Sequence, residues 1–311
     1  MPRAALNART HRTARRAALT GSTALATALT ALVGLASTPA SASAASAASA
    51  GTYVALGDSY AAGAGVPEQS AGLCLRSSKN YGSLVAAALA PSTYKDVTCA
   101  AAKVAALTTP QTYLGAPVNG PQLDAVTPDT TLVTLTIGGN DLGTSDLGIA
   151  DIIAVCSTLS LTNPFGSPCR DFYNLGGQDK LVNRLDAAAV QLGDGIRRIH
   201  AKAPNARVVL VGYPEVIPAD PRKCLGRMPI TQKDLAYLYG ILGKLNATVS
   251  RAAADNGAAF VDTAAPTVGH DACSTDPWIE GLVPTAPAVP LHPNERGERA
   301  MAGAVLRSLT G

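Results

Sequence analysis

The chain has 311 residues, 25 of them basic and 22 acidic, and a length that allows one large domain or two modest ones. Five of the basic residues and none of the acidic ones lie in the first 44 positions, so the rest of the chain carries 20 basic against 22 acidic residues, a net charge of −2. Because no run of Lys or Arg remains there, nucleic acid is excluded as an expected partner.

Residues 1–44 have the pattern of a secretory signal peptide. Five arginines lie within the first 16 residues, an apolar run follows from Ala17 to about Ala36, and residues 40–44 offer two overlapping Ala-x-Ala cleavage sites. Thr and Gly interrupt the apolar run, which weakens it as a membrane anchor. We therefore expect a secreted protein exported by the general or the twin-arginine route. A disordered Ala/Ser linker at 45–50 and a single domain over 51–311 are expected to follow.

The first strand is expected at Tyr53–Gly57, and Ser59 stands two residues beyond its last glycine. A side chain at this place projects from the carboxyl end of a sheet, where open α/β sheets bind their ligands. The same geometry exposes the serine of a strand–turn–helix elbow, so Ser59 is a candidate nucleophile. A serine that only caps the next helix is the alternative, and partners elsewhere in the chain must decide between the two.

Apolar strands alternate with helix-length segments in the rest of the chain. Further strands are expected at 96–99, 132–137, 207–212 and 258–262, and helices at 81–89, 179–203, 231–256 and 294–309. Thr231 is the expected N-cap of its helix, with Asp234 at the capping-box position. The alternation predicts an α/β fold, a three-layer doubly wound (flavodoxin-like) five-stranded parallel sheet. The stretches 142–177, 213–230 and 263–291 are expected to be irregular and to wall the site.

Six cysteines lie beyond residue 44. They are Cys74, Cys99, Cys156, Cys169, Cys224 and Cys273. An even number in an exported chain predicts three disulfides, and their spacing leaves all fifteen pairings open. Without a Cys-x-x-Cys pair or neighbouring histidines, neither a metal site nor a cofactor is expected.

Of the histidines after residue 44, His292 is the best candidate for a general base. Pro290 and Pro293 bracket it and restrict the backbone on either side, so that a rigid loop presents the imidazole. An ordinary loop histidine is the alternative. His200 falls in the last turn of a helix and His270 in a polar loop, positions that histidines occupy without catalytic roles.

A Gly138-Gly139-Asn140-Asp141 stretch ends the strand expected at 132–137. Gly and Asn tolerate left-handed backbone angles, so a simple turn explains the pattern. In a catalytic site the Asn140 amide would instead donate a hydrogen bond to a developing oxyanion.

Three short blocks together resemble the SGNH (GDSL) hydrolases, above all the secreted bacterial esterases and lipases with three disulfides. They are Gly57-Asp58-Ser59-Tyr60, Gly138-Gly139-Asn140-Asp141 and His292-Pro293-Asn294, and the resemblance covers about residues 51–309. It implies the SGNH-hydrolase fold, Ser59 as nucleophile and His292 as base. It also implies an oxyanion hole made by the Ser59 N–H, the Asn140 side chain and a backbone N–H at Ala101. The family has glycine at that last position, and alanine serves there if its φ is negative.

The aspartate that many family members carry three residues before the histidine is replaced by Val289. Some secreted members orient the histidine with a main-chain carbonyl, so the resemblance implies a Ser59–His292 dyad held by the Val289 carbonyl. Asp271, Asp276 and Glu280 are the rival acids. The resemblance also implies disulfides in sequential order, Cys74–Cys99, Cys156–Cys169 and Cys224–Cys273.

The function expected is a secreted serine hydrolase that cleaves acyl or lipid esters through an acyl-enzyme, without cofactor. Phospholipase A and carbohydrate acetylesterase activities are alternatives on the same site. The second is less favoured, because sugar-binding sites usually contain several exposed aromatic side chains and only 4% of the residues are aromatic. A secreted binding module with a dead site is the non-enzymatic alternative. We expect a monomer that meets a small-molecule or lipid ester and touches lipid surfaces at most transiently.

Overall fold

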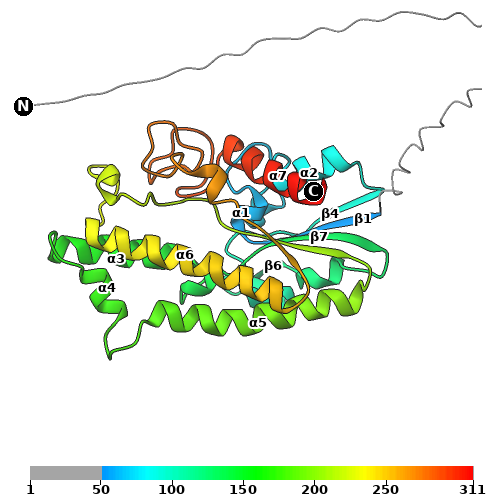
Figure 1. Cartoon of the computed structure of the whole chain (residues 1–311), viewed down its shortest axis with the longest axis horizontal. Coiled ribbons are helices and arrows are strands. Elements are labelled where there is room, and N and C mark those ends of the chain that lie inside the picture. The colour runs from blue at the N-terminus through cyan, green and yellow to red at the C-terminus, as the bar shows by residue number, and fades with distance from the viewer. Residues whose placement is uncertain (1–50, 311) are drawn as a thin grey trace, which may run out of the picture. The chain divides into compact units, whose positions relative to one another are not determined.

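The central element is a five-stranded parallel sheet (Figure 1). The computed structural model describes residues 51–310, so the predicted signal peptide (1–44) and linker (45–50) lie outside the described residues. The strands are β1 (Thr52–Gly57), β4 (Thr93–Asp96), β7 (Thr130–Thr136), β8 (Arg207–Val211) and β9 (Ala259–Val261). They lie in the order β4-β1-β7-β8-β9, each parallel to its neighbours. This is the flavodoxin-like order, which confirms the predicted fold class.

Helices cover both faces of the sheet. On one face lie α5 (Lys180–Lys202) and α6 (Gln232–Asp255), and on the other α2 (Tyr81–Leu89) and α7 (Glu295–Thr310) (Figure 1). Successive side chains of a strand point to opposite faces, so β1 sends Leu56 into the α5/α6 layer and Tyr53 into the α2/α7 layer. Both faces of the inner strands are buried, which explains why β1 and β8 are almost continuously apolar.

The strand expected at 96–99 lies three residues earlier, as β4. Thr93 to Asp96 pair with Thr52 to Ala55 of β1 at the edge of the sheet. The chain continues beside β1, since the Val97 and Cys99 N–H groups donate to the Ala55 and Gly57 carbonyls. The strand was predicted too late in the chain because the prediction relied on apolar residues, whereas this strand lies at the partly exposed edge of the sheet and carries polar side chains.

The stretch 142–177 was expected to be irregular, and this prediction is wrong. It contains the helices α3 (Ala150–Thr162) and α4 (Pro168–Tyr173). Asp234 holds the start of α4, accepting from the Cys169 and Arg170 N–H groups at 3.1 and 3.0 Å. Asp234 therefore does not complete a capping box in α6, although Thr231 does cap that helix. The helices α3 and α4 depend on partners distant in sequence, which a local pattern does not reveal.

Shorter elements and three disulfides complete the described part. They comprise α1 (Ser59–Ala62) and the two-stranded ribbons β2 (Gln69–Ser70) with β3 (Arg76–Ser77) and β5 (Gln111–Tyr113) with β6 (Ala116–Asn119). The disulfides join Cys74 to Cys99, Cys156 to Cys169 and Cys224 to Cys273, the sequential order that the resemblance implied. Among the helices of residues 51–310, none combines the length and apolarity needed to cross a membrane.

Candidate active site

Ser59 is lifted to the carboxyl end of the sheet by a turn that only glycine permits. Gly57, the last residue of β1, has φ +140°, and a Cβ there would come within 2.4 Å of the Thr136 carbonyl oxygen on β7. Asp58 then caps α1 by accepting the Tyr60 N–H at 2.9 Å. The chain therefore turns sharply from strand to helix at Ser59, which remains 8% exposed.

The structure brings His292 to Ser59 from the other end of the chain. The Nε2 atom of His292 lies 2.7 Å from the Ser59 Oγ, and its Nδ1 lies 2.9 Å from the Pro290 carbonyl oxygen. A carbonyl only accepts, so Nδ1 carries the proton and Nε2 is free to accept the serine hydroxyl. Burial lowers the pKa of His292 to about 4, although the ring is only partly shielded from solvent. The imidazole is therefore neutral at pH 7, as a general base must be.

The carbonyl that orients the imidazole is that of Pro290, and the prediction of Val289 is wrong. The Val289 oxygen accepts the backbone N–H of His292 at 3.1 Å and so closes a turn over residues 289–292. Inside this turn Leu291 adopts a left-handed backbone with φ +63°. The turn directs the Pro290 carbonyl to the Nδ1 side of the ring. The prediction of Val289 rested only on the position three residues before the histidine, which does not reveal such a turn.

The three rival carboxylates all have other partners. Asp271 accepts the Cys273 N–H at 2.8 Å, and Asp276 pairs with Arg296 at 2.7 Å. Glu280 accepts the Asn294 amide and the Thr285 N–H, both at 2.6 Å. Burial raises the pKa of Glu280, but these hydrogen bonds outweigh it and the net shift is downward. None of the three carboxylates forms a hydrogen bond with His292 in the described residues.

Asn140 lies in the turn that follows β7, with its amide fixed and one N–H to spare. Its Oδ1 accepts the Ile149 N–H at 3.2 Å, and its Nδ2 donates one proton to the Ala102 carbonyl at 3.1 Å. Because an amide nitrogen carries two protons, one remains for a ligand. The Ser59 N–H likewise donates to no group of residues 51–310.

Ala101 does not meet the condition of a negative φ that was set for its role as a donor. Its φ is +60°, in the left-handed region that glycine favours. Ala101 therefore holds, at a cost in strain, a conformation that a glycine would adopt without strain. Its N–H donates to no group within the described part of the chain, so it remains available as a donor.

Two tyrosines that the sequence interpretation overlooked complete the site. The Tyr213 hydroxyl, just beyond β8, donates to the Asp58 carboxylate at 2.5 Å and accepts the Gly139 N–H at 2.8 Å. Burial raises the pKa of Asp58 to about 7 against the opposing effect of this bond. Tyr60 packs its ring on the imidazole of His292. Two features of the sequence could have indicated them: Tyr60 directly follows Ser59, and Tyr213 lies just beyond the end of a predicted strand.

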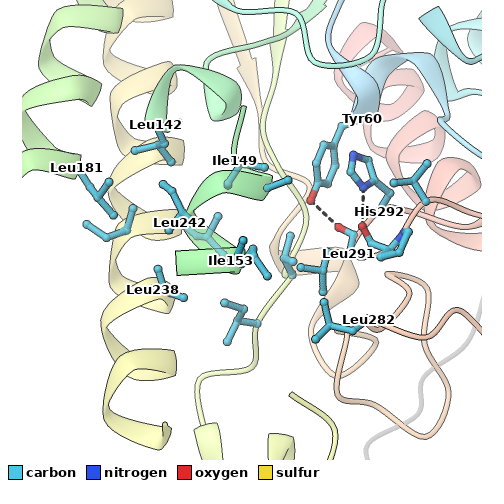
Figure 2. Close-up of a pocket in the computed structure, with 18 residues that line it drawn as sticks. Tyr60, Leu142, Ile149, Ile153, Leu181, Leu238, Leu242, Leu282, Leu291 and His292 are labelled. Atoms are coloured by element: carbon cyan, nitrogen blue, oxygen red, sulfur yellow. Dashed lines mark hydrogen bonds between the residues drawn. The ribbon is translucent and has the colours of Figure 1, made fainter. Parts of the chain in front are cut away.

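An apolar pocket of about 430 Å³ opens beside the Ser59–His292 pair (Figure 2). Tyr60 and His292 lie on one side, and the rest of the wall comes from α3, α5, α6, the turn after β7 and two loops. Leu142, Ile149, Ile153, Leu238, Leu242 and Leu282 are among its lining residues. Within residues 51–310 no three His, Cys, Asp or Glu side chains are grouped so as to hold a metal ion.

Comparison with known proteins identifies the family. Residues 55–300 match the family model described as GDSL-like Lipase/Acylhydrolase. The chain belongs to the GDSL-like lipase/acylhydrolase family. It is accordingly an ester hydrolase of the lipase/esterase type, and the SGNH (GDSL) resemblance is confirmed.

Relatives in this GDSL-like family share most of their length with the chain. Lipase 2 of Streptomyces coelicolor is 43% identical over 257 residues, which cover 80% of this chain and 83% of the relative. A phospholipase A1 from Streptomyces albidoflavus NA297 has a similar structure, with TM-score 0.62, 30% identity and coverage of 83% and 99%. An extracellular lipase from Streptomyces rimosus aligns with TM-score 0.61, 28% identity and coverage of 83% and 98%.

Proposed function

We propose that the protein is a secreted serine hydrolase of lipid acyl esters in which Ser59 is the nucleophile and His292 the general base. The observation that carries this proposal is the 2.7 Å contact between Ser59 Oγ and His292 Nε2 beside an apolar pocket. A serine paired with a neutral imidazole is the arrangement that activates a hydroxyl for acyl transfer.

In the proposed reaction, His292 Nε2 takes the Ser59 hydroxyl proton while the serine oxygen attacks the ester carbonyl carbon. The Ser59, Ala101 and Asn140 N–H groups stabilise the resulting oxyanion. His292 then returns the proton to the leaving alcohol, which departs and leaves an acyl-enzyme. Water, activated by the same imidazole, releases the acid and restores the serine. The Pro290 carbonyl holds the imidazole in the required tautomer throughout.

The pocket favours long acyl chains over acetyl groups. An apolar cavity of ~150 Å³ holds one benzene molecule, so the pocket of about 430 Å³ has room for on the order of 15 carbon atoms. Each buried methylene contributes ~0.8 kcal/mol, which an acetyl ester cannot provide. A phospholipase A activity fits the same pocket, and the phospholipase A1 neighbour supports it as the second candidate.

A serine-directed fluorophosphonate probe and an ester panel test this function. The wild-type protein should be labelled, and Ser59→Ala should not. Activity on p-nitrophenyl esters should rise with chain length to at least eight carbons and should exceed that on acetyl-xylan, while a phosphatidylcholine assay decides the second candidate. An unlabelled, correctly folded wild type would support the binding module instead.

We also propose that the protein is exported as a monomer and contacts lipid surfaces transiently. The signal pattern of residues 1–44 and the three disulfides support export. Leu161 and Phe165, 79% and 88% exposed at the end of α3 and just beyond it, offer apolar contacts to the substrate's own lipid surface. Phe165→Ser should lower retention on phosphatidylcholine vesicles, whereas Leu114→Ser, 83% exposed elsewhere, should not.

The N-terminus of protein recovered from the culture medium should lie near residue 45, and its molar mass measured by light scattering should be that of a monomer. Retention inside the cell with residues 1–44 intact would contradict export, and a stable dimer would contradict the monomer.

A further inference from the structure

The loop that carries His292 is attached to Tyr60, the residue next to the nucleophile. The Tyr60 hydroxyl donates to the Leu291 carbonyl at 2.6 Å (Figure 2). Leu291 is the residue with the left-handed backbone, a conformation that a leucine keeps only when its surroundings hold it. Tyr60 therefore fixes the turn that aims the Pro290 carbonyl and the imidazole.

The ring of Tyr60 also contacts the imidazole directly. The two ring centroids are 4.6 Å apart and the planes are inclined by 31°. An aromatic face at this distance attracts a cation, and more strongly where water is displaced. His292 becomes a cation only while it holds the serine proton, so this attraction acts chiefly in the transition state.

Tyr60 is itself held in place by Tyr213. The rings of Tyr213 and Tyr60 meet with centroids 5.1 Å apart and planes at 77°, the T-shaped arrangement that aromatic pairs prefer. The Tyr213 hydroxyl is anchored to Asp58 and Gly139, on the turns that carry Ser59 and Asn140. The two tyrosines thus connect all three parts of the site.

On the basis of the proposed function, we infer that Tyr60 is a positioning residue that replaces the absent triad acid: its hydroxyl orients the histidine loop and its ring stabilises the imidazolium. A triad carboxylate performs both tasks with one group. In this chain the Pro290 carbonyl fixes the tautomer, and an uncharged aromatic ring supplies the attraction for the positive charge.

A double-mutant cycle on p-nitrophenyl acetate tests this inference. The acetyl group is too short to fill the pocket, so loss of pocket contacts has little effect on the rate. Tyr60→Leu should lower kcat roughly 10- to 30-fold with KM nearly unchanged. Tyr60→Phe keeps the ring and should recover kcat to within about fivefold of wild type. In a His292→Ala background, Tyr60→Leu should have no further effect, because it acts through the imidazole.

Tyr239→Leu, at a 40% exposed position on α6, is the matched control and should leave kcat unchanged. If Tyr60→Leu does not fold, Tyr60→Met takes its place in the cycle. An undiminished kcat, a loss confined to KM, or an equal loss without His292 would overturn the inference. Activity that survives Ser59→Ala would instead refute the proposed function, so the two failures are distinguishable.

Discussion

Asn140 has one amide proton left after its two structural hydrogen bonds, and this defines its expected contribution to the reaction. We predict that Asn140→Ala lowers kcat by roughly 10²- to 10³-fold, the usual effect of removing one oxyanion donor. The measurement is steady-state hydrolysis of p-nitrophenyl butyrate. A variant within threefold of wild type would show that the oxyanion is held elsewhere.

Ala101 offers the complementary test, because glycine keeps the N–H and removes the strain. At φ +60° an alanine is less favourable than glycine by ~1 kcal/mol. We expect Ala101→Gly to keep kcat within a few-fold and to raise the free energy of unfolding by up to that amount, measured in urea. A large fall in kcat with unchanged stability would mean that the alanine methyl group itself contacts the substrate.

The pH dependence of activity should reflect the buried imidazole. Burial lowers the pKa of His292 to about 4, and the base works only when neutral. We therefore predict that kcat/KM does not decrease as the pH falls through 6.5, the ordinary pKa of histidine, and that it falls tenfold per pH unit only below about pH 4. A change near pH 7 would belong to Asp58, whose pKa burial raises to about 7, and Asp58→Asn should remove it. An acid limb at 6.5 in that variant would contradict the assignment.

At the scale of elements, the first turns of α3 form part of the pocket wall, while Thr158, Leu161 and Thr162 further along the helix are exposed. Ile153→Trp fills space that an acyl chain would occupy. Excluding two methylenes costs about 1.6 kcal/mol, so kcat/KM for a dodecanoyl ester should fall roughly 15-fold while the acetyl ester is unaffected. Thr158→Trp, at an exposed position further along the same helix, should change kcat/KM for neither ester. Equal losses on both esters would show a general disturbance rather than a shortened pocket.

The sequence predicted the central elements because each is encoded locally. Apolar runs such as β7 and the amphipathic spacing of α5 are visible without any partner. By contrast, α3 and α4 are joined by a disulfide whose pairing the cysteine spacing left open, and α4 is held by Asp234, 65 residues beyond Cys169. The same limit applies to the site. Ser59, His292 and Asn140 stand in recognisable blocks, whereas the role of the Pro290 carbonyl depends on the left-handed turn at Leu291.

For the whole molecule, the three disulfides should differ in their contribution to stability. Cys224 and Cys273 close a loop of 49 residues, and Cys156 and Cys169 one of 13. In the chain-entropy model, these loops correspond to about 4 and about 3 kcal/mol. We therefore expect the Cys224→Ser, Cys273→Ser double variant to lose more free energy of unfolding in urea than the Cys156→Ser, Cys169→Ser variant. The opposite ranking would mean that packing in the folded state, and not loop length, determines how much each disulfide contributes to the free energy of unfolding.

The two groups that touch at the active site are 233 residues apart in the chain. A ribosome adds ~5 to 20 residues per second, so roughly 10 to 50 s pass between the synthesis of Ser59 and that of His292. Throughout this interval the nascent polypeptide has the proposed nucleophile but not the proposed base. Any fragment that ends before residue 292 is expected to be inert toward esters. The order of translation thus keeps the nascent chain inactive until His292 is made, as a pro-segment keeps an enzyme precursor inactive.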